Sequence, residues 1–500
     1  MSNTAEIIKQ TVNKSIQNFN YKNEATAIIL AAGHGKRIKS HTSKMLHKIW
    51  GKPTVERVYD ACKNGLNDAN VIVVVGIKAL DVIDAVGKRD FTSYAYQEEQ
   101  NGTGHAVQVA LNNIDRKKYK GIVYVLPGDM GLIDKKTISL FKKKFEESNA
   151  DMMVLTGLYE GAVENNSYGR IVRVKERDIE NYLSRENEGK VLEIIEYKDI
   201  LKLDDNSPYI REFNGKKYSY TKQELLENNE FNSGVYAFKY NHLSTLIDTI
   251  KSDNAQNEIY ITDLISIFNK NGLTVGAVYP DTQHVLMGFN NKSVLKEMET
   301  IARHQTYNLI KDIIEIEDPD DFFIHEDVVI QILELDNQGQ PLDIKIGKGA
   351  YIGQGVKLNY NINIKKNVFI DGNVTFGKNI TIWENAHLST FFNQQFIIED
   401  NVEILWGDII KGNIIIGENS RIESSVNMTG SDEHPLRIGK NVTIKGTSYI
   451  FGSIIDDDMF VEHSVLIKKK VEKLMKKSGE IRTVKFFLPL PEGMDTISDL

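Results

Sequence analysis

Residues 26–53 read TAIILAAGHGKRIKSHTSKMLHKIWGKP, and the organisation of the first half of the chain follows from this stretch. The apolar run Ala27–Leu30 stops abruptly at small residues, which is typical of a buried parallel strand that ends in a tight loop. Gly33 and Gly35 lack a Cβ, so the main chain there can approach a phosphate closely and direct N–H groups at it. The cations that follow are Lys36, Arg37 and Lys44. The stretch therefore predicts a site for a nucleoside triphosphate.

Two familiar phosphate-binding loops do not fit this stretch. A Walker loop requires a glycine five residues before its Gly-Lys pair and Ser or Thr after it, where Leu30 and Arg37 stand. A dinucleotide fingerprint requires a third glycine where Ile38 stands. The pattern that remains is L-A-A-G-x-G-x-R followed by Lys44. A glycine-rich turn with solvated Lys and Arg side chains is the alternative interpretation.

Composition limits the class of protein. A chain of 500 residues exceeds one ordinary core, so two or three domains are expected. The net charge of −8 argues against nucleic acid as the main partner. The single cysteine, Cys62, excludes an intramolecular disulfide framework and a cysteine-rich metal site. No apolar run approaches the ~18 residues of a membrane span, and the N-terminus lacks the apolar core of a signal peptide. We expect a cytoplasmic protein with no membrane partner.

Strand and helix signals alternate from Ala25 to about Val285. Residues 71–76 and 121–126 have the pattern of buried strands, whereas 135–147 and 243–250 have that of helices. This alternation predicts an α/β, Rossmann-like domain with a mostly parallel sheet and helices on both faces. Ligands of such sheets bind at the carboxyl ends of the strands, where the Gly33 loop and the Gly128-Asp129 step fall.

The expected boundaries follow from changes in composition. Residues 1–24 carry a weak helical pattern and are expected to lie outside the main fold as an extension. The α/β domain takes residues 25–300, with charged surface insertions near 175–188 and 201–229. Residues 301–343 hold the end of a long helix and a connection. Residues 468–500 form a tail, with a basic helix over 468–477 and an extended apolar stretch after it.

Beyond Asp343, branched or large apolar residues recur every six positions. The seventeen positions are Ile346, Ile352, Leu358, Ile364, Ile370, Phe376, Ile382, Leu388, Ile398, Ile404, Ile410, Ile416, Ile422, Met428, Ile438, Ile444 and Ile450. A period of six predicts an all-β parallel β-helix of hexapeptide repeats over residues 344–467, with one inward side chain per hexad. The gaps 388–398 and 428–438 are expected to be loops. Solenoids of this type often pack as trimers, so a homotrimer is expected.

The loop pattern and the hexapeptide region together resemble the bacterial bifunctional N-acetylglucosamine-1-phosphate uridyltransferase family, a sugar-nucleotide pyrophosphorylase joined to a left-handed β-helix. The resemblance covers residues 26–300 well and 344–467 in architecture only. It implies a reaction of UTP with a sugar 1-phosphate that gives a UDP-sugar and pyrophosphate. It assigns catalytic roles to Arg37 and Lys44. It assigns nucleotide binding to Leu30, Ala31, Ala32, Gly33 and Gly35.

Residues 97–106, QEEQNGTGHA, resemble the base-recognition loop of this family. A glutamine amide offers a donor and an acceptor together, which suits the edge of uracil, and a glycine lets the main chain approach the base. The resemblance implies that Gln97, Gly102 and Thr103 contact the nucleotide. An ordinary helix start capped by Thr103 is the alternative.

Asp129 follows a predicted strand, where a carboxylate can hold Mg²⁺ against triphosphate oxygens. The resemblance implies Mg²⁺ as cofactor, with Asp129 and Asn290 as its ligands. A turn residue and a helix cap are the alternative interpretations of these two positions. The chain departs from the family at Lys36, Ser43 and Pro127, where Thr, Pro and an aromatic residue are usual.

Five further positions match the sugar contacts of the family. Glu and Asn side chains can hydrogen-bond sugar hydroxyls, and Asn can also bond an acetamido group. The matched residues are Gly169, Glu196, Asn232, Tyr260 and Thr262. Taken singly, such residues at strand ends are usually just solvated. Because the two insertions lie beside this group, the identity of the sugar is the least secure expectation.

The β-helix departs further from the family. Acetyl transfer to glucosamine 1-phosphate there uses a histidine base, but its motif of His followed by Tyr-Leu-Gly-Asp is absent. His387, His434 and His463 are expected at the surface, so no acetyltransferase activity by that mechanism is expected. Three alternatives to a UDP-N-acetylglucosamine-forming enzyme stay open: a pyrophosphorylase for another sugar or nucleotide (UDP-glucose or dTDP-glucose type), an acyltransferase acting through the β-helix, and a non-catalytic scaffold.

Overall fold

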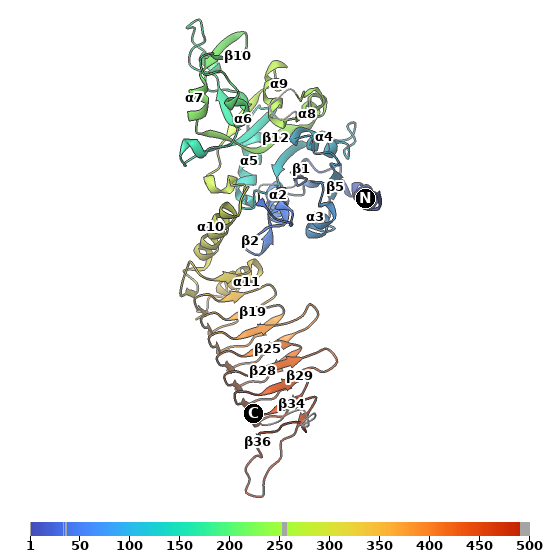
Figure 1. Cartoon of the computed structure of the whole chain (residues 1–500), viewed down its shortest axis with the longest axis vertical. Coiled ribbons are helices and arrows are strands. Elements are labelled where there is room, and N and C mark those ends of the chain that lie inside the picture. Colours follow the sequence, from blue (N-terminus) through green and yellow to red (C-terminus); the bar gives the residue numbers. More distant parts are fainter. Residues whose placement is uncertain (1, 34, 36–37, 253–257, 491–500) are drawn as a thin grey trace, which may run out of the picture. The chain divides into compact units, whose positions relative to one another are not determined.

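The computed structural model describes residues 2–33, 35, 38–252 and 258–490. The chain divides into two compact units, Met1–Met298 and Glu299–Leu500 (Figure 1). Helix α10 (Lys292–Ile310) runs across the division. No helix among the described residues combines the length and the apolar character that crossing a membrane requires.

A nine-stranded sheet forms the first unit, and its main path runs β13-β7-β12-β6-β1-β4-β5. The strands are β1 (Ala25–Leu30), β4 (Asn70–Val75), β5 (Thr92–Tyr96), β6 (Ile122–Pro127), β7 (Met152–Leu158), β8 (Arg170–Arg173), β9 (Val191–Ile195), β12 (Glu230–Lys239) and β13 (Val275–Val278). β1 pairs in parallel with both β4 and β6, which confirms the predicted Rossmann-like arrangement. β12 is antiparallel to both of its neighbours, β6 and β7. A small hairpin, β2 (Lys48–Ile49) and β3 (Lys52–Pro53), lies outside this sheet.

Helices cover both faces of the sheet. α2 (Thr54–Leu66), α3 (Ala79–Val86) and α5 (Lys135–Glu147) share one hydrophobic core with Ala27 and Ile29 of β1. α4 (Thr103–Leu111), α8 (Tyr240–Leu246) and α9 (Leu264–Lys270) share the other core with Ile28. A strand buried on both faces reads as a continuous apolar run, which is why Ala27–Leu30 shows no alternation.

The N-terminal segment packs on this unit, so the expectation that residues 1–24 lie outside the main fold is wrong. Helix α1 (Ser2–Ser15) contributes Ile8 and Val12 to the first core. Ser15 Oγ accepts a hydrogen bond from Tyr94 N at 2.9 Å, and Asn18 Nδ2 donates to Thr92 O at 3.2 Å. Because β5 is the last strand of the sheet, these bonds occupy backbone groups of an edge that would otherwise be open.

The predicted insertions form a small layer with a core of its own. β10 (Tyr209–Phe213) and β11 (Lys216–Tyr220) make a hairpin, flanked by α6 (Tyr197–Leu201) and α7 (Lys222–Glu227). Tyr218 and Leu225 pack there against Val172 of β8. The threonine Thr221 starts α7 with a complete capping box to Glu224, so this segment is defined locally as well.

The second unit is a parallel β-helix built of three sheets, whose stacked coils are visible in Figure 1. The first holds β14 (Glu315–Ile316), β16 (Lys345–Ile346), β18 (Ile362–Ile364), β21 (Ile380–Ile382), β24 (Glu403–Ile404), β27 (Arg421–Ile422), β30 (Thr443–Ile444), β33 (Phe460–Glu462) and β36 (Val484–Lys485). The second holds β15 (Phe323–Ile324), β17 (Tyr351–Ile352), β19 (Phe369–Asp371), β22 (His387–Ser389), β25 (Ile409–Gly412), β28 (Asn427–Gly430), β31 (Tyr449–Phe451) and β34 (Val465–Ile467). The third holds β20 (Val374–Phe376), β23 (Phe396–Ile398), β26 (Ile414–Ile416), β29 (Leu436–Ile438), β32 (Ile454–Ile455) and β35 (Lys470–Val471). Helix α11 (Glu326–Asp336) precedes β16.

All seventeen predicted inward residues are buried, which confirms the hexapeptide pattern. The strands nevertheless extend beyond 344–467 on both sides, from β14 to β36. After Ile450 the buried residues within strands are Ile455, Val461, Leu466 and Val471, so spacings of five interrupt the period of six. The predicted helix over 468–477 is wrong. Lys470–Val471 instead pairs with β32. This pairing satisfies backbone groups of β32 that a helix over 468–477 would leave at an open sheet edge, and it outweighs the local helix propensity.

Asparagines hold the corners of successive coils. Asn361, Asn379, Asn401 and Asn419 have φ between 56° and 59°, a left-handed conformation that asparagine tolerates better than most residues. The Nδ2 of each of the first three donates to the Oδ1 of the next asparagine along the stack, at 2.9–3.0 Å. The ladder therefore satisfies side-chain groups and fixes the turn at the same time.

Candidate active site

The loop after β1 presents bare main chain at the carboxyl edge of the sheet. A Cβ on Gly33 would meet only Met45 Cε, at 3.9 Å, so this position faces open space. Gly35 has φ +66°, and a Cβ there would lie 2.7 Å from Lys44 Cβ, so only glycine fits. Gln100 Nε2 donates to Ala32 O at 2.5 Å and ties the loop to the next segment. Arg37, the predicted catalytic arginine, lies outside the described residues.

Lys44, Asp129 and Asn290 converge from three distant segments. Lys44 lies in a short 3₁₀ turn and is 9% exposed. Its Nζ forms an ion pair with Asp129 Oδ2 and donates to Asn290 Oδ1 at 2.9 Å. The Nζ also lies 5.4 Å from the centre of the Phe289 ring, which suits a cation–π contact. The carboxylate and the amide oxygen predicted to hold a metal thus already face one positive charge.

The segment predicted to recognise the base, residues 97–106, follows β5. Gln97 is buried, and its Nε2 donates to Gly102 O at 3.1 Å and contacts His105 Nδ1 at 3.3 Å. Gly102 has φ +103°, and a Cβ there would lie 2.6 Å from Ile259 O, so glycine is required. Thr103 does not cap α4. Its Oγ1 accepts a hydrogen bond from Ile261 N at 3.2 Å instead.

Two acidic side chains with raised pKa values stand near the predicted sugar contacts. Burial raises the pKa of Glu196 to about 7, and the nearby charges of Asp199 and Asp263 act in the same direction. Burial likewise raises the pKa of Asp263 to about 6, helped by Asp199. Gly169 lies against the carboxylate of Glu196, since a Cβ on Gly169 would come within 3.1 Å of Glu196 Oε1. Perturbed carboxyl groups in a cavity are typical of functional sites.

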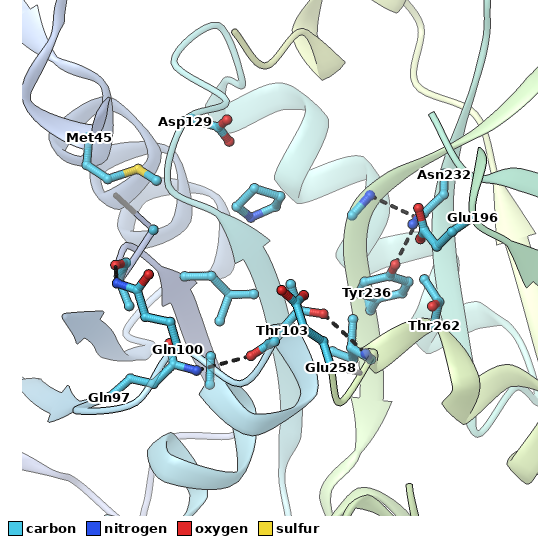
Figure 2. Close-up of a pocket in the computed structure, with 18 residues that line it drawn as sticks. Met45, Gln97, Gln100, Thr103, Asp129, Glu196, Asn232, Tyr236, Glu258 and Thr262 are labelled. Carbon is cyan, nitrogen blue, oxygen red and sulfur yellow. Dashed lines mark hydrogen bonds between the residues drawn. The ribbon is translucent and has the colours of Figure 1, made fainter. Parts of the chain in front are cut away.

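One cavity of about 380 Å³ joins these segments (Figure 2). The predicted residues that line it are Leu30, Ala32, Gly33, Gln97, Gly102, Thr103, Asp129, Glu196, Asn232 and Thr262. Ala31, Gly35, Lys44, Gly169, Tyr260 and Asn290 are described but do not line it. The volume and the mixture of apolar walls with a few polar groups are typical of a small-molecule site.

Part of the chain is similar to known proteins. A family model, the MobA-like NTP transferase domain, matches residues 27–184. The bifunctional protein GlmU of Clostridium tetani is 36% identical over 306 residues, and that of Acetivibrio thermocellus is 37% identical over 309. Both matches cover 61% of this chain and 58% of the relative. Residues 27–184 are therefore similar to an NTP transferase domain.

The resemblance to the uridyltransferase family expected from the sequence is confirmed by these relatives, although the match spans only 58% of their length. A solved Bacillus anthracis structure, in complex with a sucrose, is 18% identical and covers 56% of this chain and 95% of its own. Its TM-score of 0.39 is too low to bear on fold or function.

Eight residues that line the cavity were not predicted from the sequence: Met45, Gln100, Ala106, Pro127, Gly234, Tyr236, Glu258 and Ile261. Gln100 lies within the quoted base-recognition stretch, and its contact with Ala32 could not be read from spacing. Tyr236 lies on β12 near Asn232, but a bulge between Asn232 and Val235 shifts the register there. Strand periodicity alone therefore gives no firm direction for this side chain.

Proposed function

We propose that the chain is a nucleotidyltransferase that joins UTP to a sugar 1-phosphate, most specifically N-acetylglucosamine 1-phosphate, and releases pyrophosphate. One observation carries this proposal: a single cavity is lined by the Gly33 loop, by Gln97 and Gly102, by Asp129, and by Glu196 and Asn232. Such a transfer needs four parts in one place. They are a loop for the triphosphate, a segment for the base, a carboxylate at a strand end, and polar side chains for the sugar.

In the proposed reaction, a phosphate oxygen of the sugar 1-phosphate attacks the α-phosphorus of UTP. A P–O bond forms there as the bond to the bridging oxygen of the β-phosphate breaks, and pyrophosphate leaves with the electron pair. The nucleophile is already anionic, so no general base is required. The protein's contribution is then positioning and charge neutralisation. Lys44 would neutralise charge near the α-phosphate, and Arg37 would act on the departing phosphates.

The hydrogen bonds of Gln97 indicate which atom of its amide would contact the base. Both Nε2 hydrogens face protein acceptors, Gly102 O and His105 Nδ1. Among the described residues, no hydrogen bond involves its Oε1. An unoccupied acceptor suits the N3–H of uracil, whereas the unprotonated N3 of cytosine would leave it unsatisfied. This favours UTP over CTP.

Mg²⁺ fits the proposed site. Asp129 Oδ2 and Asn290 Oδ1 both contact the Lys44 ammonium, so two hard oxygen atoms already converge on one cationic position. When bound, the ion would supply charge stabilisation between nucleotide and sugar phosphate. No cluster of three or more His, Cys, Asp or Glu side chains within the described ranges could hold a metal, so further ligands would come from phosphates or water.

Pyrophosphate release over a matrix of nucleoside triphosphates and sugar 1-phosphates tests the proposal. We expect the highest kcat/KM for UTP with N-acetylglucosamine 1-phosphate in the presence of Mg²⁺, and loss of release on chelation. Preference for glucose 1-phosphate or dTTP would keep the reaction class and change the substrates. No release with any pair would reject the proposal.

A further inference from the structure

The Asn232 amide is held in one orientation by two donors of its own strand. β12 bulges after Asn232, and Gly234 there has φ +83°. Gly234 N donates to Asn232 Oδ1 at 2.9 Å, and the Tyr236 hydroxyl donates to the same oxygen at 2.9 Å (Figure 2). A main-chain N–H can only donate, so the amide oxygen, and not the nitrogen, must face it.

This arrangement leaves Asn232 with only a donor for a ligand. The two lone pairs of Oδ1 are taken by Gly234 and Tyr236. Within the described part of the chain, Nδ2 forms no hydrogen bond, although Asn232 lines the cavity. A group bound beside Asn232 must therefore accept a hydrogen bond if it is to be satisfied.

Tyr236 is suited to a permanent donor role. Its side chain is 1% exposed, and burial raises the pKa of its hydroxyl, so the phenol keeps its proton at physiological pH. Glu196 is the acidic side chain beside Asn232 in the same cavity (Figure 2). Because burial raises the pKa of Glu196 to about 7, that carboxyl is not a full counter-charge for a cationic ligand near neutral pH.

We propose that Tyr236 is a positioning residue that makes Asn232 a donor-only contact and thereby selects the sugar by its hydrogen-bonding character. The favoured sugar 1-phosphate carries an acceptor at this position, such as the carbonyl oxygen of an N-acyl group. A sugar that carries an ammonium there places a donor against a donor and leaves both unsatisfied. The inference rests on the proposed function, because it concerns the sugar end of the same cavity.

Tyr236→Phe removes the hydroxyl and frees one lone pair of Asn232 Oδ1, which can then accept from a cationic sugar. We expect the kcat/KM ratio of N-acetylglucosamine 1-phosphate to glucosamine 1-phosphate, both with UTP, to fall by about fivefold, the effect of one hydrogen bond. The fall should come from a higher KM for the N-acetylated substrate and a lower KM for the amino sugar, with kcat changed by less than about twofold.

Tyr124→Phe is the matched control. Tyr124 lies on the neighbouring strand β6 and is equally buried, and its hydroxyl has no hydrogen-bond partner among the described residues. Its removal should leave the ratio unchanged. A ratio within about twofold of wild type for Tyr236→Phe, or an equal shift for Tyr124→Phe, would overturn the inference.

Failure of the proposed function is distinguishable from failure of this inference. If wild type releases no pyrophosphate with any sugar 1-phosphate, calorimetric binding of the same two sugar phosphates to wild type and Tyr236→Phe replaces the kinetic readout. The same fivefold loss of preference is expected in Kd. Equal preference in both proteins would then reject the role of Tyr236 without reference to catalysis.

Discussion

At the scale of single residues, Lys44 is a charged side chain at a buried position of the first unit. It is almost fully buried, and its charge is balanced by Asp129, with Asn290 supplying a further oxygen. A buried ammonium without such partners would be strongly destabilising, so its burial depends on these oxygen atoms. The Asp129 carboxylate is also the proposed ligand of Mg²⁺, so the Lys44 ammonium and the metal ion would both lie next to it in the proposed reaction.

Lys44→Ala and Asp129→Ala each remove one charge from this point. We expect each to lower kcat for pyrophosphate release by about 10²-fold or more, the scale of a lost electrostatic stabiliser. Lys48→Ala, an exposed lysine of β2, is the control and should retain wild-type activity. Turnover within a few-fold of wild type in either site variant would remove that residue from the proposed mechanism.

At this scale the sequence alone points to residues whose backbone conformation is unusual. Glycine is required at position 102 by its φ of +103° and by the approach of Ile259, and Gly102 lines the cavity, while its contact with the base stays a prediction. Gln100 and Tyr236 were missed because their roles arise from contacts with Ala32 and Asn232, which no spacing along the chain encodes. Residues that act by holding another residue in place require coordinates.

At the scale of elements, the β-helix shows what periodicity can and cannot predict. Ile346 to Ile450 follow the period of six because each coil repeats the same inward position. The tail over 468–477 has a helix-forming composition, yet Lys470–Val471 pairs with β32. Tertiary pairing therefore overrides local propensity at the end of a solenoid, where an open sheet edge is available.

Asp408 is a buried acidic residue inside the β-helix. It is 0% exposed, and its Oδ1 accepts from Val426 N at 2.8 Å, while its Oδ2 has no hydrogen-bond partner within the described residues. Burial raises the pKa of this carboxyl to about 8. An unfolded aspartate titrates near ~3.9, so between about pH 4 and pH 8 the folded state holds a proton that the unfolded state has released. Folding stability therefore falls as pH rises through this window.

Asp408→Asn replaces the carboxyl by a neutral group of the same shape. We expect the free energy of unfolding of the variant to exceed that of wild type by about 5 kcal/mol at pH 8 and to match it at pH 4, because wild type loses ~1.4 kcal/mol per pH unit while only its unfolded state is ionised. Urea unfolding of the full chain across this range measures the difference. Asp432→Asn, at an exposed loop position, is the control and should follow wild type. Parallel pH profiles for Asp408→Asn and wild type would contradict the assignment.

At the scale of the whole molecule, the family model falls within the first of the two units. The family model covers residues 27–184, and the GlmU relatives match over 61% of the chain. In the β-helix, His387 is half-buried in a column of stacked rings, with its centroid 4.6 Å from that of Phe369. Burial lowers the pKa of this imidazole, and Nε2 contacts Ser389 Oγ at 3.2 Å. The ring thus has a packing role in the sheet, as its neighbours Tyr351 and Phe369 do.

We therefore expect no acetyl transfer to glucosamine 1-phosphate by the full chain. Incubation with acetyl-CoA and glucosamine 1-phosphate should release no free CoA thiol above a blank without enzyme, because no histidine of the required motif is present to take the proton of the amine. The same preparation should release pyrophosphate from UTP and N-acetylglucosamine 1-phosphate, which shows that the protein is folded. Thiol release that disappears in His387→Ala would show instead that the stacked imidazole acts as a base, and the β-helix would then be catalytic by an arrangement the family motif does not describe.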